Sequence, residues 1–261
     1  MIQAVIFDMD GVLVDTSASY HQAILQTTVS YAVRVLKLPR PPVADAWVHL
    51  LKRAGGFNND WHLTAALLRG WASYGPSFDC RAYAEALADA GGGLRAVDAV
   101  LGPANGLGFH PEGGLKTTFQ ALYLGGLIDL ETLLVPAEAL DLGVPLAVAT
   151  GRPEAEAEYA LRRLGIRDRF AAVVTHDDAE RAGMPGKPHP WLLLEAARRL
   201  GVNGGCVYVG DQPDDMRAAK AAGFRAVGVT GGDVTAEAAL IAAGAGVVFA
   251  GVASAIRQIV P

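Results

Sequence analysis

Six short apolar runs are spaced unevenly along this chain, and their spacing limits the folds that the chain can adopt. The runs cover residues 4–7, 145–149, 172–174, 206–209, 226–229 and 247–249. Their length and their content of β-branched residues are typical of buried strands. From residue 144 onward they alternate with helical patterns over 154–164, 190–200 and 215–222, each of which ends next to a glycine. This alternation predicts an α/β fold with a doubly wound parallel sheet.

Residues 8–144 separate the first run from the second. A strand–helix–strand unit needs only about 30 residues, and a structureless loop of such length is not expected in a compact domain. Most of the gap carries helical patterns, over 18–36, 43–53, 60–71, 81–90 and 117–123, whereas 102–114 is rich in Gly and Pro and predicts a loop. We therefore expect residues 16–130 to form an inserted helical domain, and residues 1–15 and 131–261 to form the sheet domain.

The composition argues against several classes of protein. The chain has 22 Lys and Arg against 27 Asp and Glu, so it lacks the basic excess with which proteins bind nucleic acids. Its two cysteines are too few for a disulfide scaffold or a zinc cluster and suit a reducing compartment. The N-terminus lacks the basic segment of a signal peptide, and the uncharged stretch 238–256 is divided by Gly244 and Gly246. We expect a cytoplasmic protein that binds neither nucleic acid nor membrane; no oligomeric state is predicted.

Polar residues of complementary chemistry follow the predicted strands. They provide carboxylates, a hydroxyl and an ammonium group, and in chain order they are Asp8, Asp10, Thr150, Lys187, Asp211 and Asp215. In open α/β sheets, ligands bind outside the carboxyl ends of the strands. We therefore expect these groups to converge on one edge of the predicted sheet.

The order and local patterns of these groups closely resemble the four motifs of the haloacid dehalogenase superfamily. The matching motifs are Asp8-x-Asp10, Thr150, Lys187 and Gly210-Asp211-x-x-x-Asp215. The resemblance covers residues 1–15 and 140–261 and implies a Rossmann-like core. The inserted segment resembles the helical cap of the subfamily that includes phosphoglycolate phosphatase and β-phosphoglucomutase.

Phosphoryl transfer at so acidic an edge requires a cation, because a phosphate ester and the carboxylates repel one another. Mg²⁺ is expected, since it prefers a few carboxylates together with water and substrate oxygens. Asp8 and Asp211 can supply side-chain oxygens, and the resemblance implies that the Asp10 carbonyl completes the set. Asp215 is expected to bind the metal or a metal-bound water, whereas Asp214 is more typical of a helix N-cap.

The resemblance also implies roles in catalysis. Asp8 is the expected nucleophile, which forms an aspartyl-phosphate, and Asp10 protonates the leaving alkoxide and later deprotonates water. The residues expected to bind or stabilise the phosphoryl group are Met9, Thr150, Gly151 and Lys187. Asn58 and Asn59 precede a helical pattern, so they are candidates both for helix capping and for substrate binding.

These features predict a hydrolase, a Mg²⁺-dependent phosphatase acting on a small phosphorylated metabolite. Asp10 argues against carbon–halogen cleavage, because the resemblance implies that members with that chemistry lack an aspartate there. A phosphomutase similar to β-phosphoglucomutase stays open, since it would share the core residues. A non-enzymatic phospho-receiver is a third alternative, although such domains usually lack a hundred-residue insertion after the first strand.

Overall fold

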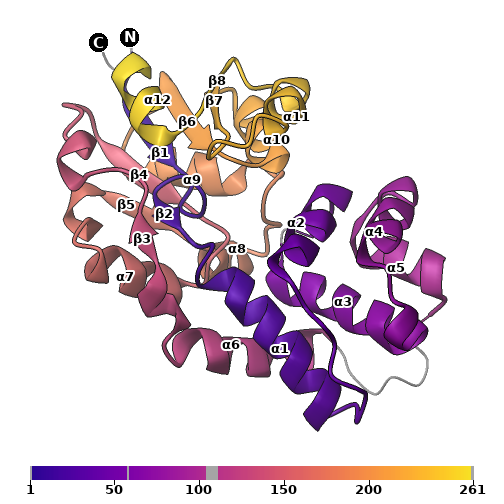
Figure 1. Cartoon of the computed structure of the whole chain (residues 1–261). Coiled ribbons are helices and arrows are strands. Elements are labelled where there is room, and N and C mark those ends of the chain that lie inside the picture. Colours follow the sequence, from indigo (N-terminus) through magenta and orange to yellow (C-terminus); the bar gives the residue numbers. More distant parts are fainter. Residues whose placement is uncertain (1, 58, 104–110, 260–261) are drawn as a thin grey trace. The chain divides into compact units, whose positions relative to one another are not determined.

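The computed structural model describes residues 2–57, 59–103 and 111–259. The chain forms two compact units (Figure 1). The first consists of Met1–Thr16 and Glu131–Pro261, and the second of Ser17–Leu130. The first unit is an α/β structure and the second is helical, which is the fold class expected from the sequence.

A six-stranded parallel sheet organises the first unit. In spatial order its strands are β5 (Ala172–Val174), β4 (Leu146–Ala149), β1 (Ala4–Phe7), β6 (Cys206–Gly210), β7 (Arg225–Val229) and β8 (Val247–Phe249). All six runs predicted as strands are confirmed, with bounds that differ by at most one residue. Val5 pairs with both Leu146 and Val207, so β1 lies at the centre, between β4 and β6.

Helices cover both faces of this sheet (Figure 1). One apolar layer joins one face to α7 (Glu154–Arg163) and α12 (Val252–Ile259). The other layer joins the opposite face to α9 (Trp191–Arg199), α10 (Pro213–Ala222) and α11 (Ala236–Ala243). Neighbouring strand residues alternate between the layers, because successive side chains of a strand point to opposite faces.

Some short elements of the first unit were not predicted. They are α8 (His176–Arg181), α12, and the antiparallel pair β2 (Val14–Asp15) and β3 (Thr132–Leu133). The pair joins the two places where the chain leaves the first unit and returns to it. Among the described residues, no helix is both long and apolar enough to cross a membrane.

The second unit contains α1 (Tyr20–Arg34), α2 (Asp45–Ala54), α3 (Asp60–Tyr74), α4 (Cys80–Asp89), α5 (Gly93–Leu101) and α6 (Lys116–Leu124). Five of these helices were predicted and α5 was not. The main core of the second unit includes Ile24, Leu51, Leu67 and Tyr123, none of which is exposed to solvent. The predicted loop at 102–114 lies partly outside the described residues, and its end contains a short helical turn at Pro111–Leu115.

Candidate active site

The Asp8 carboxylate follows β1 at the centre of the sheet. Its main-chain N–H donates to the carbonyl of Val209 over 2.8 Å, which extends the β1–β6 pairing by one residue. The residue is only 6% exposed. Burial raises the pKa of the Asp8 carboxyl well above its ordinary value, Lys187 opposes this effect, and three neighbouring aspartates add to it.

Lys187 lies between two carboxylates. Its Nζ is 2.9 Å from Asp8 Oδ1 and 2.7 Å from Asp215 Oδ1, and it donates to the Tyr208 hydroxyl over 3.0 Å. Burial disfavours the charged ammonium, but Asp215 and Asp8 together hold the pKa of Lys187 well above its ordinary value. The lysine therefore carries its charge at the Asp8 carboxylate. Tyr208 was not among the predicted site residues. Its only signal in the sequence is that a tyrosine in a buried strand needs a polar partner for its hydroxyl group.

Asp215 joins this cluster because of how α10 begins. Its Oδ2 accepts hydrogen bonds from the main-chain N–H groups of Asp211 and Gln212, at 3.2 and 3.0 Å. The Gln212 side chain completes this capping box. Asp214 instead accepts a hydrogen bond from Arg217 over 2.7 Å, so Asp215 and not Asp214 belongs to the acidic cluster.

Two glycines permit the close approach of the site's loops. A Cβ at Gly11 would come within 2.4 Å of Asp211 Oδ2, and Gly11 has φ +70°. A Cβ at Gly210 would come within 2.4 Å of the Asp215 Cβ. Neither position accommodates a side chain without displacing a carboxylate, so both glycines support the site although they carry no reactive group.

The donor set suits a divalent cation. Asp8, Asp211 and Asp215 each offer an oxygen atom, and these atoms lie within 4.8 Å of one another. Oxygen ligands of this kind are those that Mg²⁺ prefers. Mutual repulsion among these carboxylates contributes to the raised pKa of Asp8, and a bound cation would relieve that repulsion.

Thr150 follows β4 and is completely buried. Its N–H donates to Val174 over 2.9 Å, and its hydroxyl oxygen accepts from the N–H of Arg152 over 3.1 Å. Because its oxygen is the acceptor in this contact, the hydroxyl group can still donate a hydrogen bond to a ligand. A Cβ added to Gly151 would meet no atom within 4 Å, so there is space beside this residue among the described atoms.

Arg152 follows Thr150-Gly151 along the chain, and the sequence assigned it no role. Its Nε donates to Asp10 Oδ1 over 2.8 Å. Its Nη1 and Nη2 donate to Glu131 Oε2 and Oε1 over 3.1 and 3.0 Å. Glu131 and Arg152 are both buried, at 1% and 2% exposure. No sequence signal pointed to Glu131, which is far from the motifs along the chain.

The other residues predicted to bind substrate are Met9, Asn58 and Asn59. The Met9 side chain is buried in the sheet's core, so only its main chain is able to contact a ligand. Asn59 belongs to the second unit, where its Oδ1 accepts from the N–H groups of Trp61 and His62 and caps α3. Asn58 lies outside the described residues.

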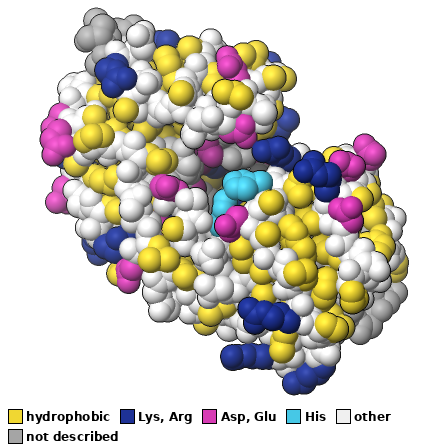
Figure 2. All heavy atoms as spheres, in the orientation of Figure 1, with side chains coloured by type: hydrophobic (Ala, Val, Ile, Leu, Met, Phe, Trp, Pro, Cys, Tyr) yellow, Lys and Arg dark blue, Asp and Glu magenta, His cyan; other side chains and the backbone are white. Residues whose placement is uncertain are grey.

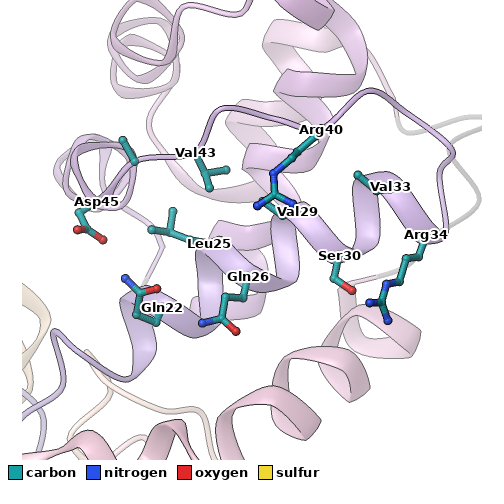
Figure 3. Close-up of a pocket in the computed structure, with 11 residues that line it drawn as sticks. Gln22, Leu25, Gln26, Val29, Ser30, Val33, Arg34, Arg40, Val43 and Asp45 are labelled. Atoms are coloured by element: carbon teal, nitrogen blue, oxygen red, sulfur yellow. The ribbon is translucent and has the colours of Figure 1, made fainter.

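A groove of about 600 Å³ lies within the second unit, along α1 (Figure 3). Its polar lining includes Gln22, Gln26 and Ser30 of α1, together with Arg34 and Arg40. None of the groups that follow the sheet's strands lines it. It therefore gives no support to the predicted chemistry.

This chain matches a family profile, curated proteins and solved structures. The profile of the haloacid dehalogenase-like hydrolases matches residues 2–223. An imidazoleglycerol-phosphate dehydratase from Phytophthora nicotianae is 32% identical over an alignment of 239 residues, and the match covers 87% of this chain and 43% of that protein. A phosphoglycolate phosphatase from Pectobacterium atrosepticum is 35% identical over 114 residues, which are 43% of this chain and 47% of that protein. The chain thus spans less than half the length of these curated relatives.

A solved structure extends the similarity to nearly the whole chain. A Thermotoga maritima protein provisionally named β-phosphoglucomutase is 25% identical, with a TM-score of 0.60 over 95% of this chain and 94% of that one. The match therefore includes the inserted helical unit as well as the sheet. Taken with the family profile over residues 2–223, it shows that this chain belongs to the haloacid dehalogenase-like hydrolases.

Proposed function

We propose that this protein is a Mg²⁺-dependent phosphatase that hydrolyses a small phosphorylated metabolite through an aspartyl-phosphate. The main support is the contact of Lys187 with Asp8, 2.9 Å apart beside the carboxylates of Asp211 and Asp215. A carboxylate paired with an ammonium group in an acidic, cation-binding cluster is suited to attack on phosphorus. The phosphatase name of the Pectobacterium relative supports the same reaction class.

Asp8 and Asp211, with Asp215 nearby, would hold Mg²⁺ together with the Asp10 carbonyl. When bound, the ion would neutralise charge between the carboxylates and the phosphate ester. An Asp8 oxygen attacks phosphorus, and the bond to the ester oxygen breaks as Asp10 donates a proton to that oxygen. Water then attacks the aspartyl-phosphate, Asp10 accepts its proton, and Asp8 and inorganic phosphate are released.

Other groups of the first unit would stabilise the transferred phosphoryl group. The Thr150 hydroxyl and the Gly151 N–H donate hydrogen bonds to its oxygens, and the Met9 main chain contributes from the first loop. Lys187 balances the negative charge of Asp8 and of the phosphoryl group. Asn58 and Asn59 of the second unit remain proposed contacts to the leaving group, in addition to the capping bond that Asn59 makes.

We assign this reaction to the cytoplasm. Both cysteines, Cys80 and Cys206, are buried thiols without a disulfide, which suits a reducing compartment. The partner is a small phosphate monoester; 2-phosphoglycolate is a first candidate because it is the substrate in the name of the Pectobacterium relative.

The first prediction concerns Asp8. Phosphate release from a panel of monoesters that includes 2-phosphoglycolate is measured with Mg²⁺ and with a chelator. We expect the wild type to require Mg²⁺, and Asp8→Asn to lower kcat by at least ~1,000-fold, as removal of a nucleophile does elsewhere. Asp214→Asn is the matched control, since Asp214 pairs with Arg217 outside the cluster, and it should change the rate less than about twofold. Equal rates for Asp8→Asn and wild type would exclude Asp8 as the nucleophile.

A phosphomutase is the second candidate, supported by the provisional name of the Thermotoga structure. The two reactions differ in their product, since a mutase isomerises a sugar phosphate without releasing phosphate. Detection of both products in the same assay separates them. A long-lived phosphorylated Asp8, with neither product formed, would instead support a phospho-receiver.

A further inference from the structure

We propose that Arg152, anchored by Glu131, positions Asp10 for proton transfer; this inference rests on the proposed phosphatase function. The Arg152 guanidinium donates to carboxylates on both of its edges. Its Nη atoms bind both oxygens of Glu131, while Nε, with Nη2, binds Asp10 Oδ1. One planar group thus connects a buried carboxylate with the expected general acid.

The Glu131–Arg152 pair is the fixed part of this arrangement. Their side chains are 0% and 1% exposed. A buried ion pair persists only where good geometry offsets its desolvation, and the two parallel hydrogen bonds of this pair provide that geometry. The Glu131 carbonyl also accepts from Arg163 Nη2 over 2.6 Å, so α7 holds its main chain. Glu131 is therefore held at both its side chain and its backbone.

The main chain of Arg152 is held as firmly as its side chain. Its N–H donates to the Thr150 hydroxyl over 3.1 Å, and its carbonyl accepts from the His176 N–H over 2.9 Å. These contacts connect Arg152 to the ends of β4 and β5. The guanidinium therefore has a fixed location relative to the sheet.

Asp10 is the exposed end of this chain of contacts. Its side chain is 36% exposed, whereas that of Arg152 is 1% exposed. Both hydrogen bonds from Arg152 end on Oδ1, and no other described residue binds Oδ2. The arginine thus fixes one oxygen of the carboxyl group and leaves the other to exchange a proton with the substrate.

This division matters for catalysis because proton transfer depends on position. A misplacement of about 1 Å can cost on the order of 100-fold in rate. Lysine cannot replace arginine here, since a single ammonium group lacks the fork that reaches two carboxylates at once. Arg152 touches neither the phosphorus nor the leaving group in this proposal, so it is a positioning residue.

The test compares two esters that differ in their need for an acid. p-Nitrophenyl phosphate has a good leaving group that departs without a proton, whereas glycerol phosphate releases an alkoxide that needs one. First-turnover release of the alcohol is measured with enzyme in excess, for wild type, Asp10→Asn, Arg152→Lys and Glu131→Gln. The control is Arg199→Lys, which alters another arginine bound to a buried carboxylate, Asp178.

We expect Arg152→Lys to slow the first turnover of glycerol phosphate about 10- to 100-fold, with the half-saturating enzyme concentration changed less than about threefold. Release of p-nitrophenolate should stay within about threefold of wild type. Asp10→Asn should show the same selectivity more strongly. Glu131→Gln keeps the shape of the side chain and should show a weaker selective slowing of glycerol phosphate, so it provides the test if Arg152→Lys fails to fold. Arg199→Lys should not slow one ester more than the other.

Equal loss on the two esters in both Arg152→Lys and Glu131→Gln would overturn the inference, because a purely structural defect lowers both rates together. Selectivity in Asp10→Asn without any in the other two variants would also overturn it, while the phosphatase function would stand. A wild type that hydrolyses neither these esters nor the metabolite panel overturns the proposed function and the inference together.

Discussion

The glycine after Asp10 is as restrictive as the charged residues around it. Gly11 has φ +70°, and its Cα faces the Asp211 carboxylate so closely that a Cβ would lie 2.4 Å from Oδ2. The two loops that carry Asp8 and Asp211 therefore meet where only a hydrogen fits. The pairing of β1 with β6 brings Asp8 and Asp211 together, and Gly11 leaves room for the Asp211 carboxylate.

The second prediction follows from that contact. Gly11→Ala is expected to destabilise the protein by more than Gly143→Ala, whose position has φ +69° but no atom within 4 Å of an added Cβ. Gly143→Ala should cost about 1–2 kcal/mol from backbone strain alone. Gly11→Ala should in addition weaken Mg²⁺-dependent phosphate release, because it displaces Asp211. Thermal unfolding and the Mg²⁺ dependence of the rate measure both effects; equal behaviour of the two variants would contradict the close approach.

The short helix α8, which follows β5, carries a buried carboxylate that connects it to a neighbouring helix. Thr175 caps α8 in a capping box, in which the Thr175 N–H donates to Asp178 Oδ2 over 2.9 Å. Asp178 Oδ1 also accepts from Arg199 of α9 over 2.7 Å. One carboxylate thus connects the start of α8 to the end of α9, next to the edge strand β5.

The third prediction concerns the pH dependence of this connection. Burial favours the neutral carboxyl group, but hydrogen bonds from Arg199 and Thr175 outweigh it and hold the pKa of Asp178 below its ordinary 3.8. A lowered folded-state pKa gives stability that is present above pH 3.8 and is lost as the pH falls further. Asp178→Asn should lower the free energy of unfolding by about 1–3 kcal/mol at pH 7.

That deficit should shrink as the pH falls below 3.8, since the wild type then loses the same interaction. Chemical unfolding at a series of pH values measures it. Glu180→Gln on the same helix is the control, because Glu180 is exposed and should change stability by less than about 0.5 kcal/mol. A deficit that stays constant down to pH 2 would contradict the assignment.

The two units of the molecule have separate cores, and the candidate metal ligands all belong to the first. On the face shown in Figure 2, acidic and basic side chains are interspersed among hydrophobic and polar ones. A cation bound at the Asp8 cluster therefore stabilises one unit directly.

The fourth prediction uses this separation. Mg²⁺ at about 100 times its Kd should stabilise the wild type by ~2.7 kcal/mol, because it binds the folded state. Asp211→Asn should be at least as stable as the metal-free wild type, since it removes one repelling carboxylate, and should lose most of the Mg²⁺ shift. Calorimetry measures both changes, and where two transitions occur only one should move with Mg²⁺. An undiminished shift in Asp211→Asn would exclude that residue as a ligand.

Patterns of apolar residues along the chain predicted the strands and helices in which buried residues recur at regular intervals. The strands of the sheet are short apolar runs, and the helices that were predicted are long enough to show a repeating apolar face. α8, with six residues, is too short for such a period, and α5 begins at the third of three successive glycines with positive φ. β2 and β3 have two residues each, so only their pairing across the chain defines them.

The motif residues Asp8, Lys187 and Asp211 could be selected from the chain because their order follows the strand ends, and parallel strands bring those ends to one edge of a sheet. Contacts between residues distant in sequence could not be obtained in this way. Glu131 binds Arg152 and Arg152 binds Asp10 only because folding brings together three parts of the first unit: its second segment at Glu131, the end of β4 and the loop after β1. Spacing along a chain encodes periodic elements and their order, whereas the pairing of buried charges depends on distances that exist only after the sheet has formed.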